Sequence, residues 1–294
     1  MSFRLAKKEI LKEGIHRVTI EQIDKIFLVI ENELNRDEAV HSVRKKFKKL
    51  RAVLRLIRDE LGEDTYKKLN VLFRNLARDI APVRDSLVLI KTLHSLDGEK
   101  EKVLFDSIEE QLKSRHKSVS KEIIEDEEKF SSIKNELNDF KPPVSSWEIS
   151  SNDFSSIKPG LKRVYKRGRN AIEVLEENPD SADFHEFRKR VKYLWYHTRI
   201  LRALWKDQLK PFAKSLHTLS DLLGDDHDLF VLSEYLRNMD SLDEADFEKI
   251  ERLINSKRKE LQKKSIFLGR LIYAESTNNF IERIKIYWKI SRIQ

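Results

Sequence analysis

One stretch of the chain is strongly and one-sidedly basic. Residues 41–58, HSVRKKFKKLRAVLRLIR, hold eight lysines or arginines, one histidine and no acidic residue. Apolar residues such as Val43, Phe47 and Leu50 recur at steps of three and four, which is the spacing of the packed face of a helix. The cations recur at similar steps on a stripe ~100° away. Because like charges on one stripe repel, the pattern indicates either a solvated face or a surface that binds an anion.

The same pattern occurs a second time, near residue 185. Residues 185–202 read HEFRKRVKYLWYHTRILR and contain a single acid, Glu186. The matched residues are His41 and His185, Arg44 and Arg188, Lys45 and Lys189, Lys48 and Lys192, Arg55 and Arg199, and Arg58 and Arg202. This internal repeat favours an anion site over a generic charged surface, because two copies can line one shared site.

A third basic cluster begins the second half of the chain. The segment GLKRVYKRGRNA, residues 160–171, contains Lys162, Arg163, Lys166, Arg167 and Arg169 around Tyr165, again without an acid. The matching first-half segment GIHRVTIEQIDK is far less basic. We therefore expect an anion site to which the two halves contribute unequally.

Composition and periodicity predict an all-α protein. The 294 residues include 7 glycines and 6 prolines, while 37% are charged and 39% are hydrophobic, and so few helix breakers favour long helices. Helical periodicity covers residues 3–34, 38–61, 64–79, 82–96 and 99–139, and then 160–177, 183–206, 208–223, 226–239 and 243–290. No stretch shows the sustained alternation that is typical of a β-strand.

A seam near residue 150 divides the chain into two related halves. Residues 141–160, KPPVSSWEISSNDFSSIKPG, contain a double proline, six serines and a Pro-Gly pair that predicts the start of a helix. Matched residues keep an offset of 143 to 146 from one half to the other. The sequence therefore predicts a first helical bundle at 1–140, a linker at 141–158 and a second bundle at 159–294.

Charge and cysteine content restrict the class of protein. The net charge of +8 indicates a polyanionic partner, and the absence of cysteine excludes disulfides and thiolate metal sites. The start of the sequence has no apolar run of signal-peptide length, and no uncharged apolar run approaches the ~18 residues that span a membrane. We expect a cytoplasmic protein that is not inserted in a membrane.

Together these motifs resemble the CHAD domain, a conserved-histidine α-helical domain. The resemblance rests on the His-x2-Arg-Lys-x2-Lys helix, on the pairs Arg84-Asp85 and His227-Asp228 that open later helices, and on GLKRVYKRGR. It covers nearly the whole chain and implies two four-helix bundles, related by a pseudo-twofold axis, with a basic groove or central pore between them. It also implies binding of inorganic polyphosphate, in some members on polyphosphate granules.

The basic motifs and the resemblance indicate three groups of polyphosphate-binding residues. They are His41, Arg44, Lys45, Lys48, Arg51, Arg55 and Arg58; Lys162, Arg163, Tyr165, Lys166, Arg167 and Arg169; and His185, Arg188, Lys189, Lys192, Arg199, Arg202 and His227. Arginine forks bind phosphate oxygens bidentately and lysines act as point charges, so such a groove can follow a phosphate chain. Trp195 departs from the repeat, which predicts a cation there, and Thr19 and Ile20 replace the tyrosine and lysine of the second half.

The three matched histidines have three alternative roles. They can form structural hydrogen bonds, contact an anion when protonated, or bind a metal ion. Because they lie on separate predicted helices without an i,i+3 or i,i+4 ligand partner, we expect neither a metal nor a cofactor. Asp85 and Asp228 are expected to orient Arg84 and His227, or to cap helices, rather than to act as catalytic acids.

Catalytic motifs are missing from the sequence. It has no Gly-rich phosphate loop, no Ser, His and Asp in a strand context and no carboxylate cluster suited to magnesium. The string EDEEK at 125–129 matches the Glu-x-Glu-x-Lys motif of triphosphate-tunnel enzymes, but that motif requires a β-strand and this one lies in a helical acidic run.

The sequence thus predicts a non-enzymatic polyphosphate-binding protein. The first alternative is a nucleic-acid-binding protein that uses the same basic surface, although few aromatic residues flank the stripes to stack on bases. The second alternative is a phosphohydrolase. The sequence leaves open the oligomeric state, and whether the groove is a closed pore or an open cleft.

Overall fold

The computed structural model of this chain consists of helices joined by short connections. It describes residues 3–33, 35–96, 102–124, 127–177 and 179–293, and over these ranges it has no β-strand, which confirms the all-α prediction. The helices are α1 (Leu11–Asn32), α2 (Arg36–Leu56), α3 (Arg58–Leu61), α4 (Glu63–Asp79), α5 (Ala81–His94), α6 (Lys102–Ile124), α7 (Glu127–Ser145), α8 (Lys158–Val174), α9 (Ser181–Leu201), α10 (Lys206–Arg237), α11 (Glu244–Ile272) and α12 (Thr277–Ile293). A 3-10 helix, η2 (Phe154–Ser156), precedes α8.

Several helix boundaries differ from the predicted ones. The segment 99–139 forms two helices, α6 and α7, and the segment 243–290 forms α11 and α12. Conversely, 208–223 and 226–239 form the single helix α10, which continues through Gly224 because buried residues face the core on both sides of it. Helix α2 ends at Leu56, so that Arg58 belongs to the separate short helix α3.

The seam between the halves is partly helical. Helix α7 continues to Ser145, and Pro159 lies in the first turn of α8, as the Pro-Gly pair predicted. Of the EDEEK string, residues 127–129 belong to α7, and residues 125–126 lie outside the described part of the chain. The division at 1–140, 141–158 and 159–294, and the twofold relation of the halves, remain predictions.

Side-chain caps fix the starts of the two basic helices. Asn35 precedes α2, and its side chain accepts a hydrogen bond from the backbone N–H of Glu38 at 3.2 Å. Asp180 and Asp183 form a reciprocal capping box at the start of α9. Such caps satisfy backbone donors that have no partner within the helix.

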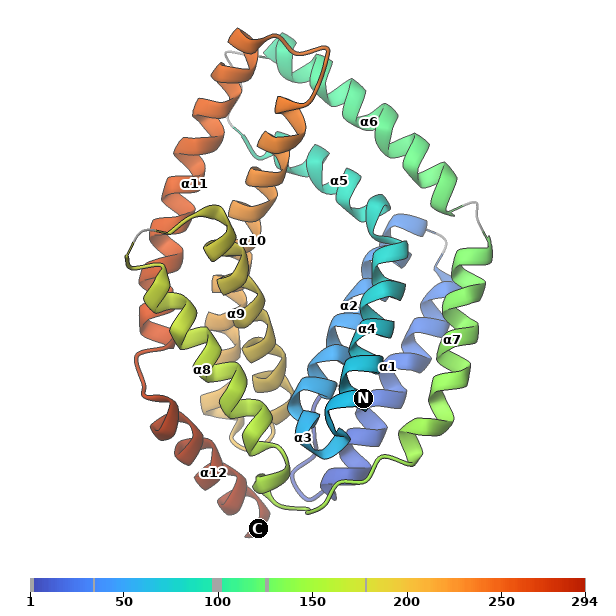
Figure 1. Ribbon diagram of the computed structural model, residues 1–294, viewed down its shortest axis with the longest axis vertical. Helices are drawn as coiled ribbons and strands as arrows, with labels where there is room; N and C mark the ends of the chain where they lie inside the picture. Colours follow the sequence, from blue (N-terminus) through green and yellow to red (C-terminus); the bar gives the residue numbers. More distant parts are fainter. Residues whose placement is uncertain (1–2, 34, 97–101, 125–126, 178, 294) are drawn as a thin grey trace.

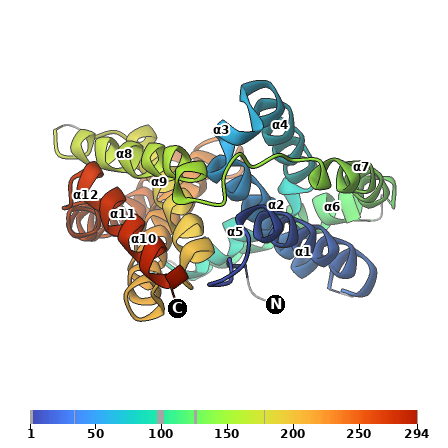
Figure 2. The same cartoon turned by 90° about the horizontal axis from the view of Figure 1, so that it is seen from below.

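The helices form two groups that face each other (Figure 1). On one side α1 packs against α2 and α7, and α2 packs against α4. On the other side α9 packs between α8 and α10, and α10 packs against α11. Figure 2 shows the groups from below, where α2 and α3 approach α8 and α9. Helix α2 of the first half and helix α9 of the second half are therefore neighbours at the centre of the molecule.

Two hydrophobic cores connect the halves. The larger core contains Phe47 and Leu50 of α2 together with Leu194 of α9. The smaller core joins Leu93 of α5 to Leu229 of α10 and to neighbouring residues of α6 and α11. Since burial of apolar surface is the main stabilising contribution, each half depends on the other for part of its stability.

The contact between the halves leaves no space at the end of α2. The fully buried His197 of α9 lies with Nε2 3.0 Å from the carbonyl oxygen of Ala52, to which it donates. Burial lowers the pKa of His197 to about 3, so the ring is neutral at physiological pH. At Gly160 of α8, an added Cβ would lie only 2.2 Å from the carbonyl oxygen of Leu56. Glycine is required there because two backbones meet.

This close approach generates a prediction about stability. We expect Gly160→Ala to lower the free energy of unfolding by roughly 2–3 kcal/mol, because the backbones of α2 and α8 must move apart. The matched control is Gly224→Ala in α10, where the nearest atom, Nη2 of Arg188, is 3.6 Å from the added Cβ. There the better helix propensity of alanine should raise stability by about 0.5–1 kcal/mol. Urea unfolding of both variants measures the difference, and equal stabilities would contradict the assigned backbone contact.

Candidate functional site

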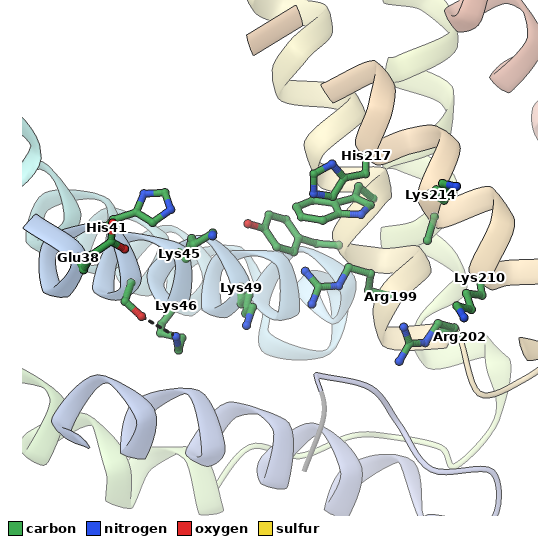
Figure 3. Close-up of a pocket in the computed structure, with 14 residues that line it drawn as sticks. Glu38, His41, Lys45, Lys46, Lys49, Arg199, Arg202, Lys210, Lys214 and His217 are labelled. Carbon is green, nitrogen blue, oxygen red and sulfur yellow. Dashed lines mark hydrogen bonds between the residues drawn. The ribbon is translucent and has the colours of Figure 1, made fainter. Parts of the chain in front are cut away.

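A cavity of about 610 Å³ lies between α2, α9 and α10 (Figure 3). Its lining residues are Glu38, His41, Ser42, Lys45, Lys46, Lys49, Trp195, Tyr196, Arg199, Arg202, Lys210, Ala213, Lys214 and His217. They recur at helical steps of three and four on all three helices, so each helix contributes one face. We call this space the lysine cavity.

The lysine cavity holds many more positive than negative charges. Seven of its fourteen lining residues are lysine or arginine, and one, Glu38, is acidic. Within the described residues, none of the seven cations forms an ion pair with a carboxylate; Lys46, for example, donates to the hydroxyl of Ser42 at 3.1 Å. The charges therefore repel one another across the cavity without a protein counterion.

Two lysines of the cavity, Lys46 and Lys49, have lowered pKa values. Burial, with help from Lys46 and Arg199, lowers the pKa of Lys49 to about 8. The pKa of Lys46 is also lowered, by burial and then by Lys25 and Lys45. A bound anion would reverse these shifts, since it favours the charged form of each lysine.

An aromatic wall accounts for the departure of Trp195 from the repeat. The guanidinium of Arg199 lies 4.8 Å from the ring of Trp195 and 5.8 Å from that of Phe3. The ring of His217 stands edge-on to Trp195 at 4.6 Å. Arg199 is therefore held beside the lysine cavity by its attraction to aromatic faces and not by a carboxylate.

A second group of cations, Arg44 and Lys48 of α2 and Arg188 and Lys192 of α9, lies outside the lining of the lysine cavity. Lys48 keeps an open side to water, yet the surrounding protein, with Arg44 and Arg188, lowers its pKa to about 8. Burial, Arg188 and Lys48 lower the pKa of Lys192 to about 6. Four residues predicted from the two matched stripes are thus neighbours, as the repeat indicated.

Carboxylates lie near the ends of this second group. Arg44 contacts Asp85 with Nη2 3.4 Å from Oδ1, and donates to the carbonyl oxygen of Ala77 at 3.2 Å. Asp228 attracts Arg188, but burial is the main reason that the pKa of Arg188 is lowered. The expected role of Asp85 as a partner of Arg84 is replaced by its contact with Arg44.

The matched histidines lie close to these cations and are neutral at pH 7. Burial, with Lys45 next, lowers the pKa of His41 to about 4. The rings of His185 and His227 are 4.3 Å apart, and burial and Arg188 lower the pKa of His227 to about 3. Among the described residues, no three His, Asp or Glu side chains come together in a way that could hold a metal ion.

Several predicted cations are already paired with acids from neighbouring elements. Arg58 makes a bidentate contact with Glu63, with its closest distance 2.6 Å, and Arg163 makes one with Asp59 at 2.8 Å and 3.1 Å. The segment 41–58 contains no acid because the acids that pair with these arginines come after it in the sequence, Asp59 in α3 and Glu63 in α4.

The remaining arginines of the first stripe turn away from the lysine cavity. Arg51 and Arg55 both donate to Oδ1 of Asn70, at 3.0 Å and 3.1 Å. Arg55 also lies 4.0 Å from the ring of Tyr193. Arg51 and Arg55 of the first stripe therefore face α4 and do not line the lysine cavity.

The cluster at 162–169 is also divided. Tyr165 is fully buried, stacks on Phe280 at 3.9 Å and donates to the carbonyl oxygen of Glu275 at 2.9 Å. Tyr165 is therefore a core residue, and its prediction as a phosphate contact is not supported by its position. Lys162 and Lys166 are exposed on α8 and do not line the lysine cavity.

Two other predicted phosphate-binding residues, Lys189 and Arg169, are also paired with acids. Lys189 lies 2.6 Å from Glu186, and Arg169 lies 3.3 Å from Glu173 on the next turn. Surface pairs of this kind contribute little to stability, but they reduce the charge that each cation presents to an anion.

Sequence reasoning missed about half of the cations of the lysine cavity. Lys46 and Lys49 lie beside the predicted stripe, and Lys210 and Lys214 lie on α10. A signal was present, because Lys210, Lys214 and His217 follow one another at steps of four and three. It could not be assigned to the site until α10 was placed beside α9.

Comparisons with known proteins agree with this architecture. The sequence model of the CHAD domain matches residues 20–237. The fold is similar to that in the crystal structure of the CHAD domain from the plant Ricinus communis, with a TM-score of 0.63 and 16% sequence identity, over 93% of this chain and 94% of that one. Comparison with curated proteins finds no match. In the described ranges, no helix is both long and apolar enough to cross a membrane.

The crowding around Lys192 generates a prediction about stability and pH. Because its pKa is about 6 in the folded chain and 10.5 ordinarily, the unfolded chain binds one more proton between these values, so stability rises with pH there. We expect Lys192→Met to raise the Tm by about 2–4 °C at pH 7, and this gain should disappear near pH 10. Lys189→Met, at a half-buried position that is paired with Glu186, is the control. Differential scanning calorimetry at both pH values measures the Tm. A lower Tm of Lys192→Met than of the wild type at pH 7 would contradict the lowered pKa of Lys192.

Proposed function

Since this chain belongs to the CHAD domain family, we propose that it binds inorganic polyphosphate without catalysing a reaction. The observation that carries the proposal is the lysine cavity, which is lined by seven lysines and arginines and by one carboxylate. Among the described residues, none of these seven cations forms an ion pair. A polyphosphate chain has about one negative charge per unit, and so supplies the counterions that the protein lacks. The cavity of about 610 Å³ has room for several units.

The types of cation support a chain ligand over a single oriented group. Lysines dominate the lysine cavity, and each presents a rotatable ammonium group that can follow a flexible anion. Arg199 and Arg202 add planar donors at one end. Such contacts read charge and spacing, and they do not require a base or a sugar.

The neighbouring cations extend the same surface. Lys48 and Lys192 lower each other's pKa, and both are near Arg188. We propose that a bound chain continues from the lysine cavity toward this group. The path would then include residues of both matched stripes.

A non-enzymatic role is supported by the state of the nucleophile candidates. Ser86, His116 and Asp37 are hydrogen-bonded in series, at 2.9 Å and 3.1 Å. However, the hydroxyl of Ser86 is buried and lies 3.0 Å from the carbonyl oxygen of Val83, so the surrounding protein shields it from a substrate. Metal-assisted phosphoryl transfer requires carboxylates, whereas the lysine cavity has Glu38 alone.

Charge removal in the lysine cavity tests the proposal. We expect the double variant Lys45→Gln, Lys49→Gln to bind long-chain polyphosphate at least tenfold more weakly than the wild type at moderate salt. By analogy with nucleic acids, its plot of log affinity against log salt should also be flatter by about one unit or more. The control is Lys263→Gln, Lys289→Gln, at exposed positions on α11 and α12. Titration calorimetry at two salt concentrations measures both effects.

The same proteins also test whether polyphosphate and nucleic acid compete for the lysine cavity. We expect polyphosphate to displace single-stranded DNA at equal phosphate concentration, and DNA not to displace polyphosphate. Equal affinity of the cavity variant and the control for polyphosphate would contradict the proposed site. The reverse order of competition would favour the nucleic-acid alternative.

The lysine pKa values predict the pH dependence of binding. An anion favours charged lysines, so binding should take up protons at pH 8, where Lys48 and Lys49 are about half protonated in the free protein. Affinity should therefore fall as pH rises from 7 to 9. Lys49→Arg, which stays charged, should weaken this dependence. Calorimetry in two buffers of different ionisation enthalpy measures the proton uptake, and proton release at pH 8 would contradict the assignment.

A further inference from the structure

A second, much smaller cavity is lined by nine residues, of which five are arginines. It has a volume of about 30 Å³ and shares no lining residue with the lysine cavity. Its arginines are Arg55, Arg58, Arg163, Arg167 and Arg190, from α2, α3, α8 and α9. No lysine and no carboxylate line it, as far as the chain is described. We call this space the arginine pocket.

Three of the five guanidinium groups are held in place from outside the pocket. Glu63 binds Nε and Nη2 of Arg58, and Asp59 binds Nη1 and Nη2 of Arg163. Arg190 is paired with Glu186 on the preceding turn of α9. Each pairing fixes the plane of the guanidinium and leaves other N–H donors available, such as Nη1 of Arg58.

Aromatic rings support the same arginines from their faces. The guanidinium of Arg55 lies 4.0 Å from the centre of the Tyr193 ring, and that of Arg58 lies 4.6 Å from the Tyr66 ring. Both tyrosines line the pocket. A site built this way loses little side-chain freedom when a ligand enters, because its donors are already oriented.

The charge balance of the pocket leaves two positive charges without a counterion. Arg58, Arg163 and Arg190 are paired with carboxylates, whereas Arg55 and Arg167 have no carboxylate partner among the described residues. Arg167 has no carboxylate partner in the described structure, and burial and the neighbouring Arg190 and Arg58 lower its pKa. A phosphate monoester or terminal phosphate carries close to two negative charges at neutral pH, which matches this excess.

We propose that the arginine pocket is a separate site for one compact phosphate dianion, either free orthophosphate or the terminal group of a phosphate chain. Planar arginine forks match phosphate oxygens bidentately, and here five guanidinium groups line one small space. If the ligand is the terminal group of a phosphate chain, which we call the chain-end case, the site adds to the proposed function and rests on it. The orthophosphate case is independent of it.

Arg167 and its neighbour Lys166 provide a matched pair of variants. Both residues are exposed cations on α8, but Arg167 lines the pocket and Lys166 does not. We expect Arg167→Gln to weaken orthophosphate binding about tenfold or more, which is the size of a lost charged hydrogen-bond contact. Lys166→Gln, and the double variant Lys45→Gln, Lys49→Gln, should bind orthophosphate like the wild type. Phosphorus NMR titration with orthophosphate measures all four proteins.

A second arm of the experiment identifies the source of the phosphate group. Linear tripolyphosphate has terminal groups and should compete with orthophosphate, whereas cyclic trimetaphosphate has none and should not. If tripolyphosphate does not compete, free orthophosphate is the ligand and the chain-end case is wrong.

Three outcomes would overturn the assignment of the pocket. They are no orthophosphate binding by the wild type, unchanged binding by Arg167→Gln, and loss of binding in the lysine-cavity variant. None of these would affect the proposed function, which is tested with long-chain polyphosphate. Conversely, absence of long-chain binding together with Arg167-dependent orthophosphate binding would reject the proposed function and leave the arginine pocket standing.

Discussion

Repulsion between unpaired cations is the constraint on which the rest of the structure depends. In the lysine cavity, Lys45 and Lys49 of α2 lie opposite Arg199 of α9 and Arg202, which follows α9, and Glu38 is the one acidic residue of the lining. Burial, and after it Lys46 and Arg199, lowers the pKa of Lys49, so the folded chain holds the charge of Lys49 at a cost. Acids at such positions would relieve the repulsion, and a bound anion would have the same effect.

The fold opposes this repulsion by joining the two halves elsewhere. The buried contact between His197 and Ala52 fixes α9 against α2, and Gly160 brings α8 against the end of α2. The second core joins α5 and α6 to α10 and α11. Apolar burial on both sides of the basic region therefore keeps the cations together even when no anion screens them.

Periodicity predicted the helical class and the pairing of the two basic stripes, because both depend on local spacing. It could not predict which cations stay unpaired. Arg58 is paired with Glu63 across a helix boundary, and Tyr165 is in the core because α12 packs on α8. The cations of α10 were missed for the same reason, since only the packing of α10 beside α9 brings Lys214 to the cavity.

Thermal unfolding with and without long-chain polyphosphate, at low and at high salt, tests the central claim most directly. If unpaired cations repel one another in the free protein, polyphosphate should raise the Tm strongly at low salt. Sodium chloride alone should raise the Tm of the free protein by screening the repulsion, and the increment due to polyphosphate should shrink accordingly. A Tm that polyphosphate does not change at low salt would contradict the account.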